Sequence, residues 1–220
     1  MFSSLNDNLL KLITITWDSF QKYNSQDITL NDLSLKIVTG KTPSTKNKNN
    51  YGKDVPFVKI PDMHNKVFVI NTRQMLSYSG ANTQSKKYIP ANSIMVSCIG
   101  TPGLVSLTDQ DVQTNQQINS IILDRQYVYY VFIYLRKMKE IIGALGSGGT
   151  TIKNLNKTDF GNIQVRIPNK PRLKSFNNVV TPLFKNIHNN LVQNVKLASL
   201  RDTLLPKLMS GELDVSNIDF

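Results

Sequence analysis

The sequence predicts an α+β fold, in which a domain with a mixed, twisted sheet is followed by a long helix of the coiled-coil type. From residue 23 to residue 167, apolar residues occur in short runs that polar turns separate, without a regular alternation of strand and helix. After residue 172, apolar residues instead recur at steps of three and four, which is the period of one helical face. A chain of 220 residues can form one domain with such an extended helix.

The first residues of the chain also have the helical period. Their shared face is formed by Leu5, Leu9, Leu12, Ile13, Thr16, Trp17 and Phe20. We therefore expect a short helix that begins almost at Met1. Its residues 5–10 are similar in type and order to residues 187–192 of the long helix.

The middle of the chain contains several short apolar runs that are typical of strands. These runs are residues 55–60, 67–70, 93–99, 104–107, 118–123 and 163–167. Residues 127–145 have helical spacing and are followed by Gly146, a common residue after a helix. Residues 41–53 are polar up to Tyr51, so we expect a loop there.

The last third predicts one long helix over residues 173–205, about 50 Å in length. Pro206 and Gly211 are expected to end it, and the segment 168–172 is expected to be a rigid joint before it. A domain of this size cannot cover so long an apolar stripe, so we expect a partner helix. The residues expected at that contact are Leu183, Ile187, Leu191, Val195, Ala198 and Leu205.

Two asparagines, Asn190 and Asn194, interrupt the apolar stripe of this helix. Buried polar residues in a coiled coil fix its register and the number of its helices at a cost in stability. Alternatively, both side chains face solvent at the edge of the stripe. The sequence leaves these two interpretations open.

The charge of the chain favours an anionic partner. Lys and Arg total 26 against 15 Asp and Glu, a formal charge of +11 with a pI near 9.7. Nucleic acid is the first expectation and an acidic membrane surface the second, although many proteins are simply basic. The single cysteine, Cys98, excludes an internal disulfide and fits the cytoplasm, and its apolar surroundings favour core packing over nucleophilic chemistry. Neither a signal peptide nor a membrane-spanning run is visible, and we expect no membrane association.

The sequence lacks the residue patterns of the common catalytic sites, and we expect neither catalytic residues nor a metal site. Gly40-Lys41-Thr42 has Leu35 where a nucleotide-binding loop requires glycine. His64, His188 and Cys98 form no recognisable set of metal ligands, and the acidic residues are too scattered to hold Mg²⁺.

Candidate DNA-binding residues are more abundant. Lys41, Lys46, Lys48 and Lys53 carry charge for phosphates in a loop that also contains three asparagines, and the alternative is a solvated surface loop. Consecutive amides at Gln113, Asn115 and Gln116 suit base edges, or an ordinary polar turn. Glycines and polar groups near Thr150, Thr151, Lys153 and Asn154 suit close approach to phosphate, or a flexible connection. Further phosphate contacts are expected from Arg73, Lys86 and Lys87.

Several motifs carry a resemblance to a known family. Residues 201–213 (RDTLLPKLMSGEL) resemble the C-terminal end of the specificity subunit of type I restriction–modification enzymes, and residues 40–44, 51–57 and 148–155 resemble marks of one target recognition domain. The motif at residues 40–44 adds Thr42 and Ser44 to the DNA-binding candidates. The resemblance covers nearly the whole chain. Such subunits usually carry two recognition domains and two long helices, whereas this chain holds one set and is expected to be a half-subunit or a truncated form.

The resemblance implies four segments. Residues 1–22 form an N-terminal helix, residues 23–170 the target recognition domain, residues 171–206 the dimerisation and spacer helix, and residues 207–220 a C-terminal tail. In the family both conserved helices are copies of one element, so the first helix is either the distal end of a copy or a plain helix packed on the domain. We keep both interpretations.

The resemblance also implies a function. The chain is expected to be a non-catalytic, sequence-specific subunit that reads one half of a bipartite target in double-stranded DNA, forms a homodimer and docks the methyltransferase subunits. S-adenosylmethionine, ATP and Mg²⁺ are expected only in the partner modification and restriction (translocase) subunits. The alternative is a standalone dimeric DNA-binding regulator, which neighbouring genes would distinguish. An RNA-binding module is disfavoured because the tyrosines and phenylalanines lie mostly in apolar runs.

Overall fold

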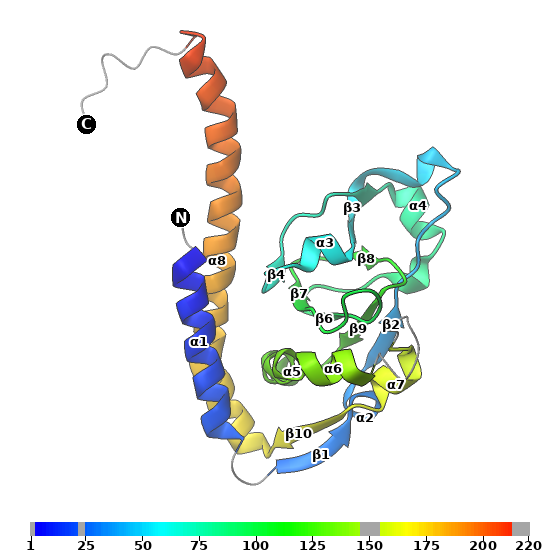
Figure 1. Cartoon of the computed structure of the whole chain (residues 1–220), viewed down its shortest axis with the longest axis vertical. Coiled ribbons are helices and arrows are strands. Elements are labelled where there is room, and N and C mark those ends of the chain that lie inside the picture. Colours follow the sequence, from blue (N-terminus) through cyan, green and yellow to red (C-terminus); the bar gives the residue numbers. More distant parts are fainter. Residues whose placement is uncertain (1–2, 22–24, 146–154, 213–220) are drawn as a thin grey trace, which may run out of the picture.

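The computed structural model describes residues 3–21, 25–145 and 155–212. A pair of helices, α1 (Ser3–Phe20) and α8 (Lys170–Met209), lies beside a domain of strands and short helices (Figure 1). Two antiparallel strands, β1 (Ser25–Thr29) and β10 (Gln164–Pro168), form a ribbon at the base of the molecule. The chain thus passes from the helix pair into the domain and back at one place.

The main sheet of the domain has five strands in the order β2-β9-β6-β7-β4. Only the β4–β7 pair is parallel, so the sheet is mixed, as the sequence predicts. Its strands are β2 (Lys36–Thr39), β4 (Phe68–Val69), β6 (Ile94–Ser97), β7 (Val105–Thr108) and β9 (Ile118–Ile122). The expected α+β fold with a long C-terminal helix is confirmed.

A second, smaller sheet carries the outer part of the domain. Its order is β5-β3-β8, with β3 (Tyr51–Val58) between β5 (Met75–Leu76) and β8 (Gln113–Thr114). Short helices lie around this sheet: η1 (Lys48–Asn50), α3 (Ile60–Met63), α4 (Tyr78–Asn82) and η2 (Ser85–Lys87). The remaining short helices, α2 (Leu30–Leu33) and α7 (Lys157–Gly161), lie near the β1–β10 ribbon (Figure 1).

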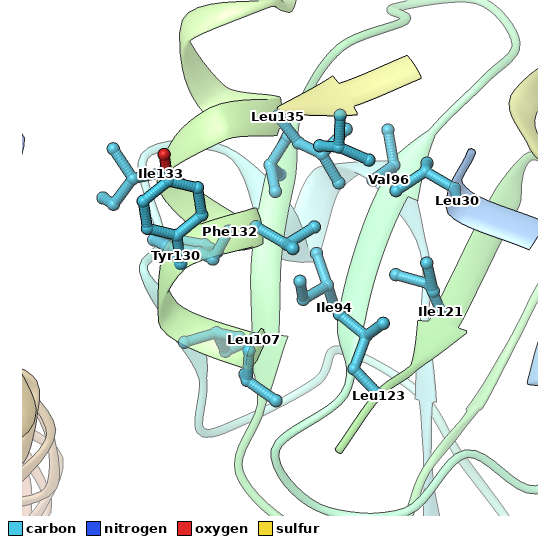
Figure 2. Packing of buried hydrophobic residues seen from close by; sticks show 14 of the residues in the cluster. Leu30, Ile94, Val96, Leu107, Ile121, Leu123, Tyr130, Phe132, Ile133 and Leu135 are labelled. Atoms are coloured by element: carbon cyan, nitrogen blue, oxygen red, sulfur yellow. The ribbon is translucent and has the colours of Figure 1, made fainter. Parts of the chain in front are cut away.

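The core lies between the main sheet and the helices. Leu107, Ile94 and Ile121 of the sheet pack with Phe132 and Leu135 of the helix α5 (Arg125–Lys137), and all are fully buried (Figure 2). On the other side of α5, Tyr130 and its neighbours meet α1 and α8. Trp17 of α1 donates a hydrogen bond from Nε1 to the Tyr130 carbonyl oxygen at 3.1 Å. One continuous core therefore joins the helix pair to the domain.

The structure corrects two expected elements. The expected helix over residues 127–145 consists of α5 and α6 (Lys139–Leu145), because Met138 (φ −82°, ψ 9°) leaves the helical conformation between them. The expected strand over residues 55–60 ends at Val58, because Ile60-Pro61 begins α3. Proline is favoured in the first turn of a helix, where its missing N–H has no partner to lose.

The long helix is longer than predicted. It runs from Lys170 to Met209, over 40 residues, and Pro206 lies inside it. Proline near the end of a helix removes only one of the last backbone hydrogen bonds, and here its ring lies at an exposed position. The helix ends instead at Met209, with Ser210 as its C-cap and Gly211 after it at a φ of +73°.

The apolar stripe of α8 is covered by the chain itself in its first half. Ile187 is fully buried, and Leu183 and Leu191 pack against the core, so the expectation that Ile187 contacts a partner helix is corrected. Val195 and Ala198 are half-buried, and Leu205 is exposed. The first helix, α1, packs along α8, which is compatible with both interpretations of the N-terminal helix.

Polar groups also tie α8 to its neighbours. Asn190 donates from Nδ2 to Oδ1 of Asn6 in α1 at 2.8 Å, so this asparagine lies at a contact within the chain. His188 Nε2 lies 2.5 Å from Oδ1 of Asp109, which follows β7. None of the helices in the described ranges is long and apolar enough to cross a membrane.

Candidate nucleic-acid interface

The outer end of the domain is a protrusion that we call the tip, formed by residues 46–53 and 77–83 (Figure 1, around η1 and α4). Two glycines allow these segments to touch backbone to backbone. A Cβ atom on Gly80 would overlap the Asn50 carbonyl oxygen, and one on Gly52 would lie 3.0 Å from Cα of Ser77. Because no side chain separates the two segments, the tip is closely packed although it protrudes.

Hydrogen bonds hold the lysine–asparagine segment of the tip in one conformation. Asn47 caps η1 by accepting the Asn49 N–H at 3.1 Å, and Asn50 donates from Nδ2 to the Ser44 carbonyl at 2.9 Å. Tyr51 donates its hydroxyl to the Pro43 carbonyl at 3.1 Å. Two of the three asparagines therefore build the loop rather than face a ligand, and Asn49 stays exposed.

Lysines gather on the outside of this framework. The exposed lysines of the tip and of the segment before it are Lys36, Lys41, Lys46, Lys48 and Lys53. The first acidic residue after them, Asp54, accepts the Tyr78 N–H at 3.0 Å through Oδ2. Exposed ammonium groups without carboxylates between them suit the phosphates of a nucleic acid.

The structure brings two predicted regions together, residues 40–42 and residues 114–116. Gly40 permits this approach, because a Cβ atom there would overlap the carbonyl oxygen of Asn115. The Lys41 N–H donates to the Thr114 carbonyl at 2.9 Å, and the Thr42 hydroxyl donates to Oε1 of Gln116 at 2.7 Å. Lys41, Thr42 and Gln116 thus form one surface, with Ser44 exposed next to it.

Two of the predicted base-reading amides are not on the surface. Gln113 has no exposed surface and donates from Nε2 to the Ala81 carbonyl at 2.9 Å. Asn115 is 7% exposed, and its amide group bonds within its own turn to Gln117. This burial corrects the expectation that Gln113 and Asn115 present their amides to base edges. Gln116, which is exposed, keeps that capacity.

The remaining candidates are more dispersed. Lys86 is exposed in η2, whereas Lys87 is half-buried and donates from Nζ to the Thr39 carbonyl at 2.9 Å. Arg73 lies near the opposite end of β3 from the tip, where its N–H bonds to Oδ1 of Asp62 at 3.1 Å. Thr150, Thr151, Lys153 and Asn154 lie outside the described residues.

Residue types that are catalytic in other proteins, such as cysteine and aspartate, have structural roles at the positions described here. Burial raises the pKa of the Cys98 thiol to about 11, so the thiol is protonated near neutral pH, in agreement with core packing. Among the residues with described positions, no cluster of three or more His, Cys, Asp or Glu side chains could hold a metal ion. Asp27 lies on the β1–β10 ribbon, where hydrogen bonding to Arg166 lowers the pKa of its carboxyl.

Sequence analysis did not single out three residues of this region, of which Gln84 is buried and the other two are exposed. Gln84 joins two loops by donating from Nε2 to the Lys41 carbonyl at 2.8 Å and to Oε1 of Gln113 at 2.7 Å. Tyr78 and Asn82 are exposed at the two ends of α4. The available signal was Ser77-Tyr78-Ser79-Gly80, in which an aromatic residue stands outside any apolar run.

Comparison with protein families gives a match over residues 23–197 to the family described as "Type I restriction modification DNA specificity domain". The specificity subunit of the type I restriction enzyme HindI from Haemophilus influenzae is 49% identical over 187 residues, which are 84% of this chain and 40% of that protein. The specificity subunit of the type I restriction enzyme MjaIX from Methanocaldococcus jannaschii is 39% identical over 102 residues, 46% of this chain and 23% of that protein. The chain thus spans less than half the length of either relative.

Solved structures with the same fold include two subunits of similar systems. The S subunit of a type I restriction–modification system from M. genitalium aligns with a TM-score of 0.60 at 16% identity, over 94% of this chain and 57% of that one. The HsdS subunit from Thermoanaerobacter tengcongensis aligns with a TM-score of 0.57 at 12% identity, over 96% and 53%. At these identities the likeness shows the shared fold.

Proposed function

The chain belongs to the type I restriction–modification DNA specificity family, and from this premise we propose that it reads one half of a bipartite target in double-stranded DNA. The observation that supports this proposal is the closely packed tip with exposed lysines on its outside. A preorganised protrusion can enter a groove without losing much conformational freedom, and its lysines can contact the phosphates on either side. The chain itself would bind without catalysing a reaction.

The helix α8 would set the distance to a second recognition domain. Its last part carries exposed leucines at Leu197, Leu200, Leu204 and Leu208, which lie on one face. Two copies of the chain that pair these faces in antiparallel orientation would place two tips on one DNA molecule. A concentration series by light scattering tests this homodimer, and a monomer at micromolar concentration, with and without DNA, would contradict it.

Methyltransferase subunits would dock on the helices, and a restriction (translocase) subunit would join through the complex. S-adenosylmethionine, ATP and Mg²⁺ would belong to those partners, in the cytoplasm. The test is methyl transfer from labelled S-adenosylmethionine to DNA. We expect transfer only when this chain and the modification subunits are combined. Transfer by this chain alone would contradict the proposal, and sequence-specific binding without any association with modification subunits would favour a standalone regulator.

DNA binding itself is tested by the salt dependence of affinity. Each phosphate contact contributes a slope of about −0.9 to log affinity against log salt. Changing Lys46 and Lys48 to Ala should therefore flatten the slope by roughly 1 to 2 units and weaken all sequences alike. The matched control changes Lys174 and Lys185, exposed on α8, to Ala. An equal effect of both pairs would show that the tip is not the contact surface.

A further inference from the structure

We propose that Tyr78 is a specificity-determining residue whose ring contacts a thymine methyl group in the major groove. The inference rests on the proposed function and identifies a base contact of that same surface. Two observations lead to it: the isolated exposure of the Tyr78 ring, and the fixed position of its backbone among the lysines of the tip. Two of the residues expected from sequence to read bases, Gln113 and Asn115, face inward.

Tyr78 differs from every other aromatic residue that the structure describes. Its side chain is 64% exposed, whereas the other described Phe, Tyr and Trp residues are buried or half-buried. A single exposed apolar residue is common on protein surfaces and indicates nothing by itself. Its position is what distinguishes it, because Tyr78 is the first residue of α4, one of the short helices of the tip (Figure 1).

The backbone at Tyr78 is held from both sides. Its N–H donates to Asp54 Oδ2 at 3.0 Å, and the preceding Ser77 accepts the Gly80 N–H through Oγ at 3.0 Å. The Ser77 hydroxyl in turn donates to the Asn49 carbonyl at 2.5 Å. Asp54 therefore positions Tyr78, and Ser77 joins it to the segment that carries Lys48. Because this backbone is already held in place, little backbone freedom is lost when the ring binds.

The chemistry of the surface assigns different tasks to its residues. Lysines supply charge to phosphates but distinguish bases poorly, whereas an apolar group can recognise the methyl group that only thymine presents in the major groove. Asn82 stands four residues after Tyr78, on the same face of α4, and is exposed. An asparagine there can bond the adenine edge of a neighbouring pair. Tyr78 and Asn82 together thus favour A·T pairs.

The test uses the full chain with its modification subunits and a library of random DNA duplexes, from which bound duplexes are selected and sequenced. The variants are Tyr78→Ala and Tyr78→Phe. The control is Leu35→Ala, which removes another exposed apolar side chain, 66% exposed, from outside the tip. Thermal melting of each variant identifies any loss of folding. We expect Tyr78→Ala to bind the selected duplex about ten-fold more weakly, to bind scrambled DNA within about two-fold of the wild type, and to lose preference at one or two positions. Tyr78→Phe and Leu35→Ala should keep the preference.

A second measurement addresses the methyl group directly. Each thymine of the selected duplex is replaced in turn by deoxyuridine, which lacks that group. One replacement should weaken the wild-type protein about three- to five-fold and leave the affinity of Tyr78→Ala unchanged. If the wild type selects a motif that Tyr78→Ala selects equally well, or if every deoxyuridine duplex affects both proteins alike, the assignment of Tyr78 is overturned while the proposed function stands. If the wild type selects no motif, the proposed function fails as well.

Discussion

The two halves of α8 have the same apolar period but opposite surroundings. In the first half, Leu173, Phe176, Val180, Phe184 and Ile187 are at most 1% exposed. In the second half, Leu197, Leu200, Leu204 and Leu208 are between 37% and 53% exposed. The period of a sequence therefore identifies which face of a helix is apolar, but it does not identify what covers that face.

The difference arises from the lengths of the neighbouring elements. In the described residues, α1 begins at Ser3 and packs along α8, to which it is bonded near its start by the Asn6–Asn190 hydrogen bond, and α5 packs lower on the same helix. Around residues 191–198, a groove with a volume of about 290 Å³ separates α8 from Phe68 and its neighbours at β4. Beyond this groove, no described element covers α8 (Figure 1). The first half belongs to the core of the chain, and the second half is available to another molecule.

The largest difference in stability is expected when the same charge is introduced into each half of α8. Ile187→Asp would bury a carboxylate among apolar side chains, and we expect it to cost more than about 4 kcal/mol of folding free energy. Leu204→Asp replaces an exposed side chain and should change the stability of the monomer by less than about 0.5 kcal/mol. Chemical denaturation followed by circular dichroism measures both. Equal losses would mean that the second half is also part of the fold.

The next effect concerns assembly. Leu200→Asp together with Leu204→Asp should weaken the proposed homodimer at least about 100-fold, because two charges would lie in an apolar contact. Sedimentation equilibrium over a range of concentrations measures the dissociation constant. The control is Val179→Asp, an exposed position in the first half of α8. A double variant that dimerises as well as the wild type would place the contact elsewhere.

The smallest expected effect tests where the covered half of α8 ends. Asn6→Ala and Asn190→Ala each remove one partner of a partly buried hydrogen bond, and a double-mutant cycle should give a coupling energy of about 1 kcal/mol. The cycle is measured by denaturation at a low protein concentration. A coupling near zero would show that α1 frays before it reaches Asn190.

Patterns that depend on near neighbours in sequence were predictable. The positions of α1, α8 and the strands β4, β6, β7, β9 and β10 follow from the spacing of apolar residues, whereas β1, β2, β5 and β8 were not predicted. The basic loop follows from its composition. The extent of α8 was not predictable from the sequence. Pro206 lies in the last turn of the helix, where the loss of one backbone hydrogen bond does not end it. Ile187 belongs to a core cluster that includes Ile13 and Trp17 of α1, which are more than 150 residues away in the sequence.

The site was less predictable than the fold for the same physical reason. Gln113 is buried because Ala81 and Gln84 offer partners for its amide, and nothing in residues 113–117 indicates this contact. The packing of Gly80 against Asn50 depends on a contact between segments about 30 residues apart in the sequence. Composition could indicate that this chain carries base-reading amides, but only the tertiary structure separates the amides that support the surface from those exposed on it.

The β1–β10 ribbon has a consequence for how such proteins change over generations. The chain enters the domain at Ser25 and leaves it at Pro168, and these residues are paired across the ribbon. A domain whose two ends lie side by side can be replaced as one unit, because only the two adjacent connections to the rest of the chain must fit. Recombination within this ribbon would therefore transfer the complete domain with its tip, while the helix pair stays unchanged.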